Sequence, residues 1–280
     1  MVPGKLGTYV CPDETSYYKQ YNESAFAITK PKAGNDCLRH YEILAAGSIP
    51  YFIDIEKIPE NTMHRFPKKL VLEARAVADE NPFNELRYNE LLSELRNYTK
   101  KHLTTKALGE YFLSETSKGI DVKFSNRKVL LISSSNRLDY QRGSISHGLF
   151  EILPKDCFHV YNYPEWLFED TTNPYLYTKR FSLTGKLPKT RHDPKTKEEI
   201  IDNLSREEYD TVIIATTAHY SGYIQDFDEV LRKHVPKNLV IIIGHDGYSY
   251  TKEYTKKFVK NSYPTLWKHI THIFVRELRD

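Results

Sequence analysis

Three short runs of apolar, mostly β-branched residues in the second half of the chain constrain its fold more than any other feature. They are Lys128–Ser133 (KVLLIS), Thr211–Ala215 (TVIIA) and Leu239–Gly244 (LVIIIG). Their apolarity is continuous rather than alternating, which is typical of strands that are buried on both faces, as in a parallel sheet. Two further segments, Cys157–Tyr161 and His272–Val275, are weaker candidates for the same sheet.

Helical segments are predicted between these strands. They cover Ser144–Leu153, Lys197–Leu204 and Asp226–His234, and the second of them opens with a capping box made by Thr196 and Glu199. Strands that alternate with helices indicate a doubly wound α/β unit.

The first half is expected to form a second unit, with few strands and much helix. Short strands are predicted at Ala25–Thr29 and Ser48–Ile53, and helices at Asp13–Ser24, at about 36–46 and through Lys68–Leu113, with breaks at Asn81-Pro82 and near His102-Leu103. The polar stretch Ser114–Asn126 would join the two units. We therefore expect two Rossmann-like lobes, residues 1–118 and 119–280, that face a central cleft. The last strand, His272–Val275, could also cross back to complete the first lobe.

Composition excludes several classes of function. The net charge of +3 does not indicate a nucleic-acid partner. Three cysteines leave an odd thiol under any pairing, which favours a reducing compartment. There is no apolar signal segment and no membrane-spanning run, so a cytoplasmic protein without membrane insertion is expected. The 21 tyrosines suit sugar binding, because a tyrosine offers both an apolar ring and a hydroxyl.

The segment Thr29–Phe52 (TKPKAGNDCLRHYEILAAGSIPYF) carries the densest chemical information. A glycine turn leads into a predicted helix, capped by Asn35 or Asp36, and a helix N-terminus attracts anions. Arg39 could grip phosphate oxygens, and Glu42, on the same helix face, could accept hydrogen bonds from a ribose. The spacing is equally compatible with a helix that carries an ordinary Arg39–Glu42 surface pair.

This segment, with DIEKIPENTM after it, resembles the donor-site signature of exostosin-like glycosyltransferases, especially those of large DNA viruses and bacteria. The resemblance is close over residues 13–70. A looser one covers residues 128–280, through LISSSNRLDYQRGSISHGL, YDTVIIATTAHYS, LVIIIGHDG and HIFVREL. It implies a GT-B-like enzyme in which Arg39 binds the donor diphosphate and Glu42 the ribose, while Lys32, Asn35 and Asp36 help to hold the phosphates.

The chain departs from the family in two respects. The donor lobe comes first here and second in the family, so the chain is either permuted or has a donor lobe that lacks its first strands. The family commonly has a tryptophan where this chain has Asn35.

The second lobe is expected to supply the catalytic base, since ligands of open α/β sheets bind outside the carboxyl ends of the strands. Asp139 follows the first strand of this lobe and is the first choice, with a helix cap as its alternative role. Asp246 is the second choice. Three histidines could contact the acceptor: His147, His219 and His245.

No metal site or cofactor is expected. Asp226-Phe227-Asp228 has the spacing of a metal-binding motif but lies in a predicted helix, and cationic side chains can stabilise a leaving diphosphate in place of a metal. The function expected is inverting transfer of a sugar from a nucleotide donor, UDP-sugar or a pentose donor such as UDP-xylose, to a glycan or glycoprotein acceptor. The alternatives are a retaining transferase on the same scaffold and a non-catalytic glycan-binding relic.

Overall fold

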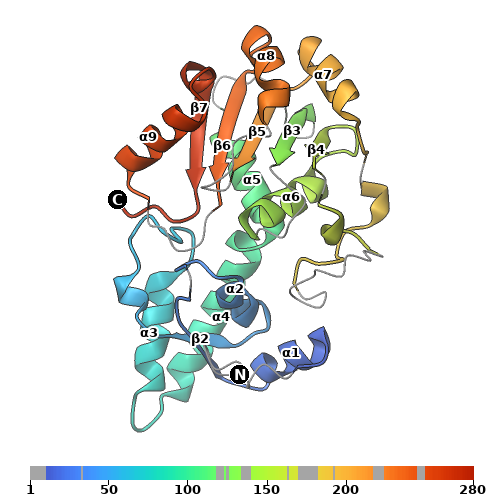
Figure 1. The fold of residues 1–280 in the computed structure, drawn as a ribbon. Coiled ribbons are helices and arrows are strands. Elements are labelled where there is room, and N and C mark those ends of the chain that lie inside the picture. Colours follow the sequence, from blue (N-terminus) through green and yellow to red (C-terminus); the bar gives the residue numbers. More distant parts are fainter. Residues whose placement is uncertain are drawn as a thin grey trace.

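The computed structural model describes residues 11–32, 34–117, 123, 126–133, 140–162, 164–169, 182–191, 193–216, 224–244 and 250–280. The fold is α/β, with a five-stranded parallel sheet flanked by helices (Figure 1). A two-stranded parallel sheet lies in the first half of the chain, among helices α1 to α4. Figure 1 shows the larger sheet above and the helices α1 to α4 below, with the C-terminus beside the region where they meet.

The larger sheet contains all five strands that the sequence predicts. They are β3 (Val129–Ser133), β4 (Phe158–Tyr161), β5 (Thr211–Thr216), β6 (Asn238–Ile243) and β7 (Ile270–Val275). Their order in the sheet is β4-β3-β5-β6-β7, and every neighbouring pair is parallel. The chain moves outward from β3 to β4 and then returns to β5 on the other side of β3. The strand order therefore reverses between β3 and β5, which is where ligands bind in doubly wound sheets.

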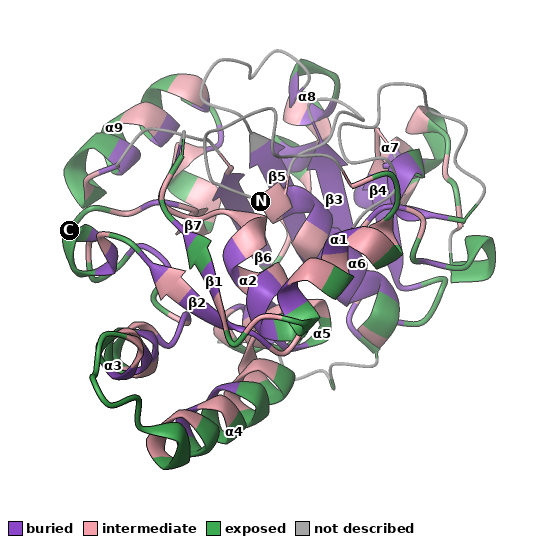
Figure 2. Ribbon diagram, turned by 90° about the horizontal axis from the view of Figure 1, so that it is seen from below, coloured by how far each residue is buried: buried purple, intermediate pink, exposed green. Residues whose placement is uncertain are grey.

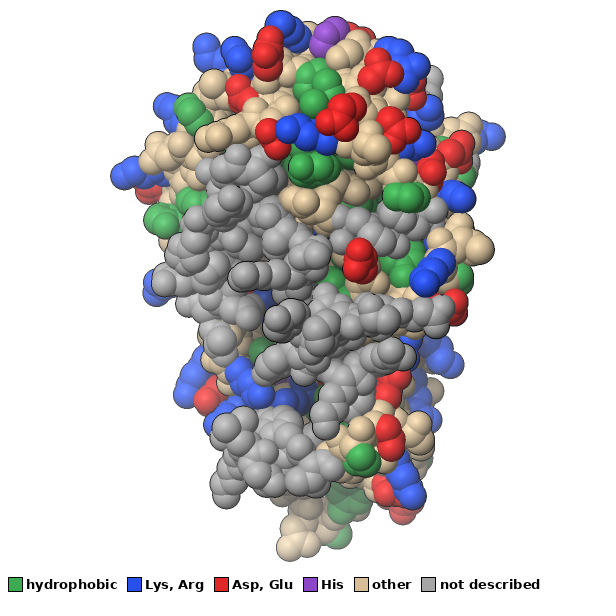
Figure 3. All heavy atoms as spheres, turned by 45° about the vertical axis from the view of Figure 1, so that its right-hand side comes forward, with side chains coloured by type: hydrophobic (Ala, Val, Ile, Leu, Met, Phe, Trp, Pro, Cys, Tyr) green, Lys and Arg blue, Asp and Glu red, His purple; other side chains and the backbone are tan. Residues whose placement is uncertain are grey.

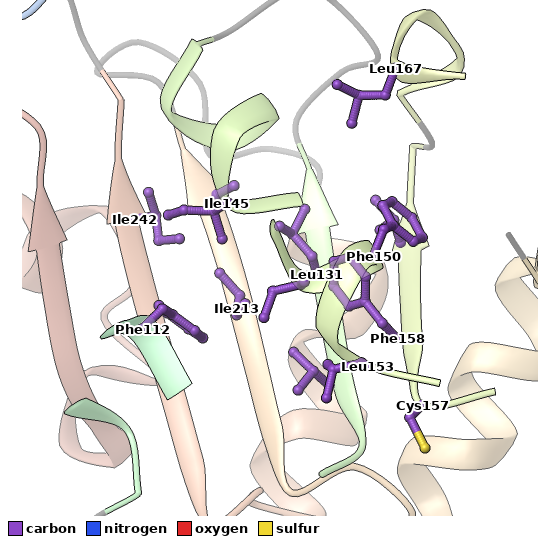
Figure 4. Close-up of a cluster of buried hydrophobic side chains, with 14 of the residues drawn as sticks. Phe112, Leu131, Ile145, Phe150, Leu153, Cys157, Phe158, Leu167, Ile213 and Ile242 are labelled. Atoms are coloured by element: carbon purple, nitrogen blue, oxygen red, sulfur yellow. The ribbon is translucent and has the colours of Figure 1, made fainter. Parts of the chain in front are cut away.

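Alternate residues of each strand face opposite sides of this sheet, as the period of a strand requires. On one side Leu131, Ile213 and Ile242 pack against α5 (Thr105–Glu115) and α6 (Tyr140–Ile152), and Figure 4 shows this cluster. On the other side the intervening strand residues pack against α7 (Lys197–Ser205), α8 (Gln225–Lys233) and α9 (Lys252–Ser262). The residues of the edge strand β7 are partly exposed, whereas Figure 2 shows the inner strands β3, β5 and β6 mainly buried. Burial on both faces explains why these strands read as continuous apolar runs.

Helix α5 precedes the sheet in sequence but closes one of its faces. Phe112 and Leu113 of α5 belong to the same buried cluster as Leu149 of α6, although α5 lies before the expected domain boundary at residue 118. The two helices approach closely because both carry glycine: a Cβ added to Gly148 would lie 2.0 Å from Thr105 O. The core of the larger sheet therefore includes a helix from the first half of the chain.

The first half contains the strands and helices that the sequence predicts. They are α1 (Glu14–Asn22), β1 (Phe26–Thr29), α2 (Leu38–Ala45), β2 (Ile49–Phe52), α3 (Lys68–Ala78) and α4 (Glu85–His102). The long predicted helical region is divided into α3, α4 and α5 at the two predicted breaks. Strand β1 pairs in parallel with β2, and the helices α2, α3 and α4 cover this small sheet with a core that includes Ile49, Val71 and Leu91.

Three features differ from expectation. Helix α9 was not predicted, and α6 begins at Tyr140, four residues before its predicted start. The last strand, β7, does not cross back to the first half but pairs with β6. The residues after β7 make the crossing instead, and Thr62 Oγ1 donates a hydrogen bond of 2.9 Å to Leu278 O.

Short 3₁₀ helices complete the described elements: η2 (Ile55–Lys57), η4 (Glu165–Leu167), η5 (Lys189–Arg191) and η7 (Trp267–His269). Among the helices of the described ranges, none has the length and apolarity needed to cross a bilayer.

Candidate functional site

A buried histidine holds the turn that precedes α2. His40 is fully buried, with Nδ1 2.9 Å from Thr29 Oγ1 and Nε2 3.0 Å from Asn35 O. A carbonyl oxygen only accepts hydrogen bonds, so Nε2 carries the proton and Nδ1 accepts from the threonine hydroxyl. Burial, with the nearby guanidinium groups of Arg39 and Arg276, lowers the pKa of His40 to about 4. The neutral ring thereby joins strand β1, the turn and α2.

The expected cap of α2 is wrong. The helix begins at Leu38 with Cys37 as its N-cap, and no side chain makes a capping hydrogen bond there. The side chain of Asp36 instead accepts a hydrogen bond of 2.9 Å from the hydroxyl of Tyr41. Burial raises the pKa of Asp36, and Arg276 and Tyr41 oppose that rise.

A carboxylate from the C-terminal segment accepts hydrogen bonds from the turn that precedes α2. Glu277 is 2% exposed, and its Oε1 accepts from the backbone N–H of Asp36 at 3.2 Å. Its Oε2 accepts from Asn35 Nδ2 at 3.3 Å, and the preceding residue, Arg276, donates from Nη2 to Asp36 O. The Asn35-Asp36 turn, which the sequence assigns to phosphates, thus holds the Glu277 carboxylate here.

Arg39 and Glu42 lie on one face of α2, as their spacing predicts. Glu42 Oε2 accepts a hydrogen bond of 2.5 Å from the hydroxyl of Tyr17 in α1, and Oε1 accepts from Ser182 Oγ. Burial raises the pKa of Glu42, and the hydrogen bonds from Ser182 and Tyr17 and the charge of Arg39 oppose that rise. Lys32 has an exposed side chain in the turn before the helix. The Glu42 carboxylate on this face is therefore held by two hydroxyl groups.

The adjacent face of α2 lines a cavity of about 230 Å³ between the first half of the chain and the larger sheet. Leu38 and Tyr41 form part of its wall, whereas Arg39 and Glu42 do not. The other walls come from residues 61–65, the α4–α5 turn, the start of α6 and the carboxyl end of β7. Its floor includes Phe112 and Ile145, which Figure 4 shows within the core cluster.

Three helices begin at this cavity. The first turns of α2, α5 and α6 contribute Leu38, Thr105 and Tyr140 to its wall, and Thr104, the N-cap of α5, lines it as well. The unpaired N–H groups of a helix start give it a partial positive charge. The cavity thus lies where a negative charge is favoured, at the carboxyl edge of the sheet.

Arginines reinforce this potential. Arg276 lines the cavity and lies beside Asp36, with Nε 4.0 Å from Asp36 Oδ2. Arg65 also lines it, with its guanidinium 4.6 Å from the centre of the Tyr111 ring. On the molecular face in Figure 3, acidic and basic side chains alternate over the upper part, and several lysine and arginine side chains gather below the middle.

His147 was predicted to contact the acceptor but lies between α5 and α6. Its Nδ1 is 3.0 Å from Thr105 Oγ1 and 3.2 Å from Glu151 Oε2, and it is not among the residues that line the cavity. Burial lowers the pKa of His147, and Glu151 opposes that change. These contacts give it a place in helix packing.

The other residues predicted for catalysis and acceptor binding fall outside the described residues: Asp139, His219, His245 and Asp246. The described residues at the ends of β3 and β4 show which groups lie at the carboxyl edge of the sheet. At the end of β3, Ser133 Oγ accepts from Arg142, which is 5% exposed, and Ser133 O accepts from Asn162 Nδ2 at 2.7 Å. The carboxyl ends of β3 and β4 are therefore lined with polar groups.

Within the described ranges, no three or more His, Cys, Asp or Glu side chains are grouped to hold a metal ion. Asp226 and Asp228 of α8 both form ion pairs. Asp226 pairs with Lys197 at 2.8 Å, and Asp228 pairs with Arg232 at 3.0 Å.

The sequence did not identify several residues of this region: Tyr17, His40, Arg65, Ser182, Arg276 and Glu277. Tyr17 and Tyr21 stand four residues apart, a helical spacing that marks a buried face of α1. His40 bonds to Thr29 and Asn35, which are near it in sequence. The contacts of Ser182, Arg276 and Glu277 join segments far apart in sequence, and no local pattern signals them. Comparison with known proteins gives no match to a family model, to a curated protein or to a solved structure.

Proposed function

We propose that the protein is a glycosyltransferase that uses a nucleotide-sugar donor, with two Rossmann-like units on either side of a cleft and the donor at the Arg39–Glu42 face of α2. The observation that carries this proposal is the Glu42 carboxylate, which accepts hydrogen bonds from two hydroxyl groups, those of Tyr17 and Ser182. A ribose hydroxyl is a donor of the same kind.

The positions of Arg39 and Glu42 on α2 support a role for the first in binding the diphosphate and for the second in binding the ribose. Arg39 precedes Glu42 by three residues, so the two side chains share one helix face. A guanidinium can bind diphosphate oxygens in two places at once, and it stays charged at every physiological pH. In the donor complex, a ribose hydroxyl would replace Ser182 at Glu42, while Tyr17 would keep its bond. The donor diphosphate would then lie beside Arg39 and Lys32.

The chemical step requires a base for the acceptor hydroxyl if the sugar is inverted. Asp139 and Asp246 are our first and second choices, because in the sequence they come after β3 and β6, and ligands of such sheets bind outside the carboxyl ends of the strands. A retaining enzyme would need neither residue. The leaving diphosphate would be stabilised by Arg39 and Lys32. UDP-sugars, including a pentose donor such as UDP-xylose, and glycan or glycoprotein acceptors are the substrates we propose.

One observation favours a second candidate, a non-catalytic glycan-binding protein. The amide of Asp36 and the side chain of Asn35 already bind the Glu277 carboxylate, so the turn predicted for phosphates is occupied. A glycan-binding protein need not bind a nucleotide.

Calorimetry with UDP decides between the two. Arg39→Ala should weaken UDP binding by about 10- to 100-fold, because a hydrogen bond to a charged group contributes about 1.5–3 kcal/mol. Glu42→Gln should weaken UDP but leave its 2′,3′-dideoxy analogue unchanged. Ser182→Ala should not weaken UDP, because it removes only the hydroxyl that the ribose replaces.

Arg87→Ala is the matched control, since Arg87 forms its ion pairs with Glu73 and Glu90 of α3 and α4 and not with α2. No UDP binding by the folded wild type would favour the glycan-binding protein. Equal UDP affinity in wild type and Arg39→Ala would refute the donor site.

A further inference from the structure

The cavity and the Arg39–Glu42 face lie on different sides of α2. Leu38 and Tyr41 contribute to the cavity wall, whereas Glu42 points to Tyr17 and Ser182. A ligand in the cavity would contact a different set of residues from a donor bound at Arg39. The cavity is therefore separate from the site proposed for the donor.

The cavity wall is mostly apolar. Its floor is formed by Phe112 and Ile145, which are 1% and 3% exposed, and Leu108 and Phe274 adjoin them. A dry cavity of about 150 Å³ is large enough to hold benzene. At about 230 Å³ this cavity has room for one ring or a short aliphatic group together with a polar substituent.

Arg65 supplies a cation at the wall of the cavity. Among the described residues Arg65 forms no ion pair, and its Nε is buried with no hydrogen-bond partner there. The guanidinium of Arg65 stacks on the ring of Tyr111, which covers one face of the guanidinium. A guanidinium at the wall of a largely apolar cavity can make charge-assisted hydrogen bonds to an oxyanion bound there.

The segment that carries Arg65 is firmly held. Lys68 Nζ donates to three carbonyl oxygens of this segment, those of Pro59, Glu60 and Thr62, at 2.8, 3.1 and 2.5 Å. The hydroxyl of Tyr98 donates to Arg65 O at 2.9 Å. Met63, between them, has a φ of 53°, which is uncommon for a residue with a side chain. This anchoring orients Arg65 before any ligand binds.

The acidic residue of the wall does not oppose an anion strongly. Asp36 accepts a hydrogen bond from Tyr41, lies beside Arg276, and burial raises its pKa. Its charge is thus compensated by Arg276.

We infer that this cavity is a second ligand site, for a small oxyacid that carries an apolar body: one ring or a short aliphatic chain with a single carboxylate or phosphate. The apolar part packs on Phe112 and Ile145, and the acid group meets the guanidinium of Arg65. The inference does not depend on the glycosyltransferase proposal.

Calorimetry with phenyl phosphate, phenylacetate, benzyl alcohol and inorganic phosphate tests it on the whole chain. Both aromatic acids should bind at least tenfold more tightly than the neutral alcohol or inorganic phosphate. Arg65→Gln should remove this preference for the acids, and Arg87→Gln, the matched surface control, should preserve it. Ser144→Phe, which places a ring at the cavity wall, should abolish binding of all the aromatic probes.

Competition separates the two sites. UDP at saturation should leave the affinity for phenyl phosphate unchanged, and Arg65→Gln should leave the affinity for UDP unchanged. Displacement of phenyl phosphate by UDP, or loss of UDP binding in Arg65→Gln, would assign the cavity to the donor and overturn the inference. Equal binding of the acids and benzyl alcohol would refute the role of Arg65, and tight binding of inorganic phosphate would refute the apolar component. Unfolding midpoints near wild type would show that the variants are folded.

Discussion

Lowering the pH should destabilise the protein through His40, the buried ring that joins β1, the turn before α2 and the helix itself. Burial and the charges of Arg39 and Arg276 lower the pKa of His40 from 6.5 to about 4 in the folded chain. At 1.36 kcal/mol per pKa unit, the folded state favours the neutral ring by about 3 kcal/mol. The unfolded chain binds a proton more readily, so folding stability falls as protons are added.

The direction and range follow from these two pKa values. The contribution of neutral His40 is complete above pH 6.5 and is lost as the pH falls toward 4. Between pH 7.5 and pH 5 the loss should amount to about 2 kcal/mol. His40→Gln removes the titrating group, so the variant should lack this loss. The difference in unfolding free energy between wild type and His40→Gln should therefore narrow by about 2 kcal/mol over this range.

Urea unfolding at a series of pH values measures this difference. Other groups with shifted pKa values, such as His147 and Asp36, are present in both proteins and cancel. Leu86→Ala is the control, since Leu86 is 74% exposed and does not titrate, and its difference from wild type should stay constant. A constant difference between wild type and His40→Gln from pH 7.5 to pH 5 would show that the fold does not hold this ring neutral.

Three further predictions concern packing, capping and catalysis. Gly148→Ala should lower the unfolding free energy by about 1–3 kcal/mol in urea titrations, because its Cβ would lie 2.0 Å from Thr105 O and force α5 away from α6. Thr196→Ala should cost about 1 kcal/mol in the same assay, because it removes the bond to the N–H of Glu199 and breaks the capping box of α7; no change would show that solvent replaces the cap. Asp139→Asn should keep UDP affinity and lower turnover by about 10²–10⁴-fold if Asp139 is the base; full turnover would exclude that role.

The sequence alone determined the positions of the larger sheet's strands and most of the helices. Continuous apolar runs such as 239–244 can be recognised because a strand covered on both faces has no polar side, and this property is local. The capping box of Thr196 and Glu199 was also predicted, and both of its hydrogen bonds are present. Helix α9 was missed because its apolar residues are few, and its burial on the sheet through Val259 depends on tertiary packing.

The candidate site was decided only by the tertiary structure. Local spacing placed Arg39 and Glu42 on one helix face, but it could not show that Ser182 bonds to Glu42, or that Glu277 bonds to the turn at Asn35. These partners are separated by more than a hundred residues, so their contact depends on how the two halves of the chain pack. The cavity has the same origin, because its wall combines Arg65 of one half with β7 of the other. Periodicity and capping act over a few residues, whereas a site between packed segments exists only once the chain has folded.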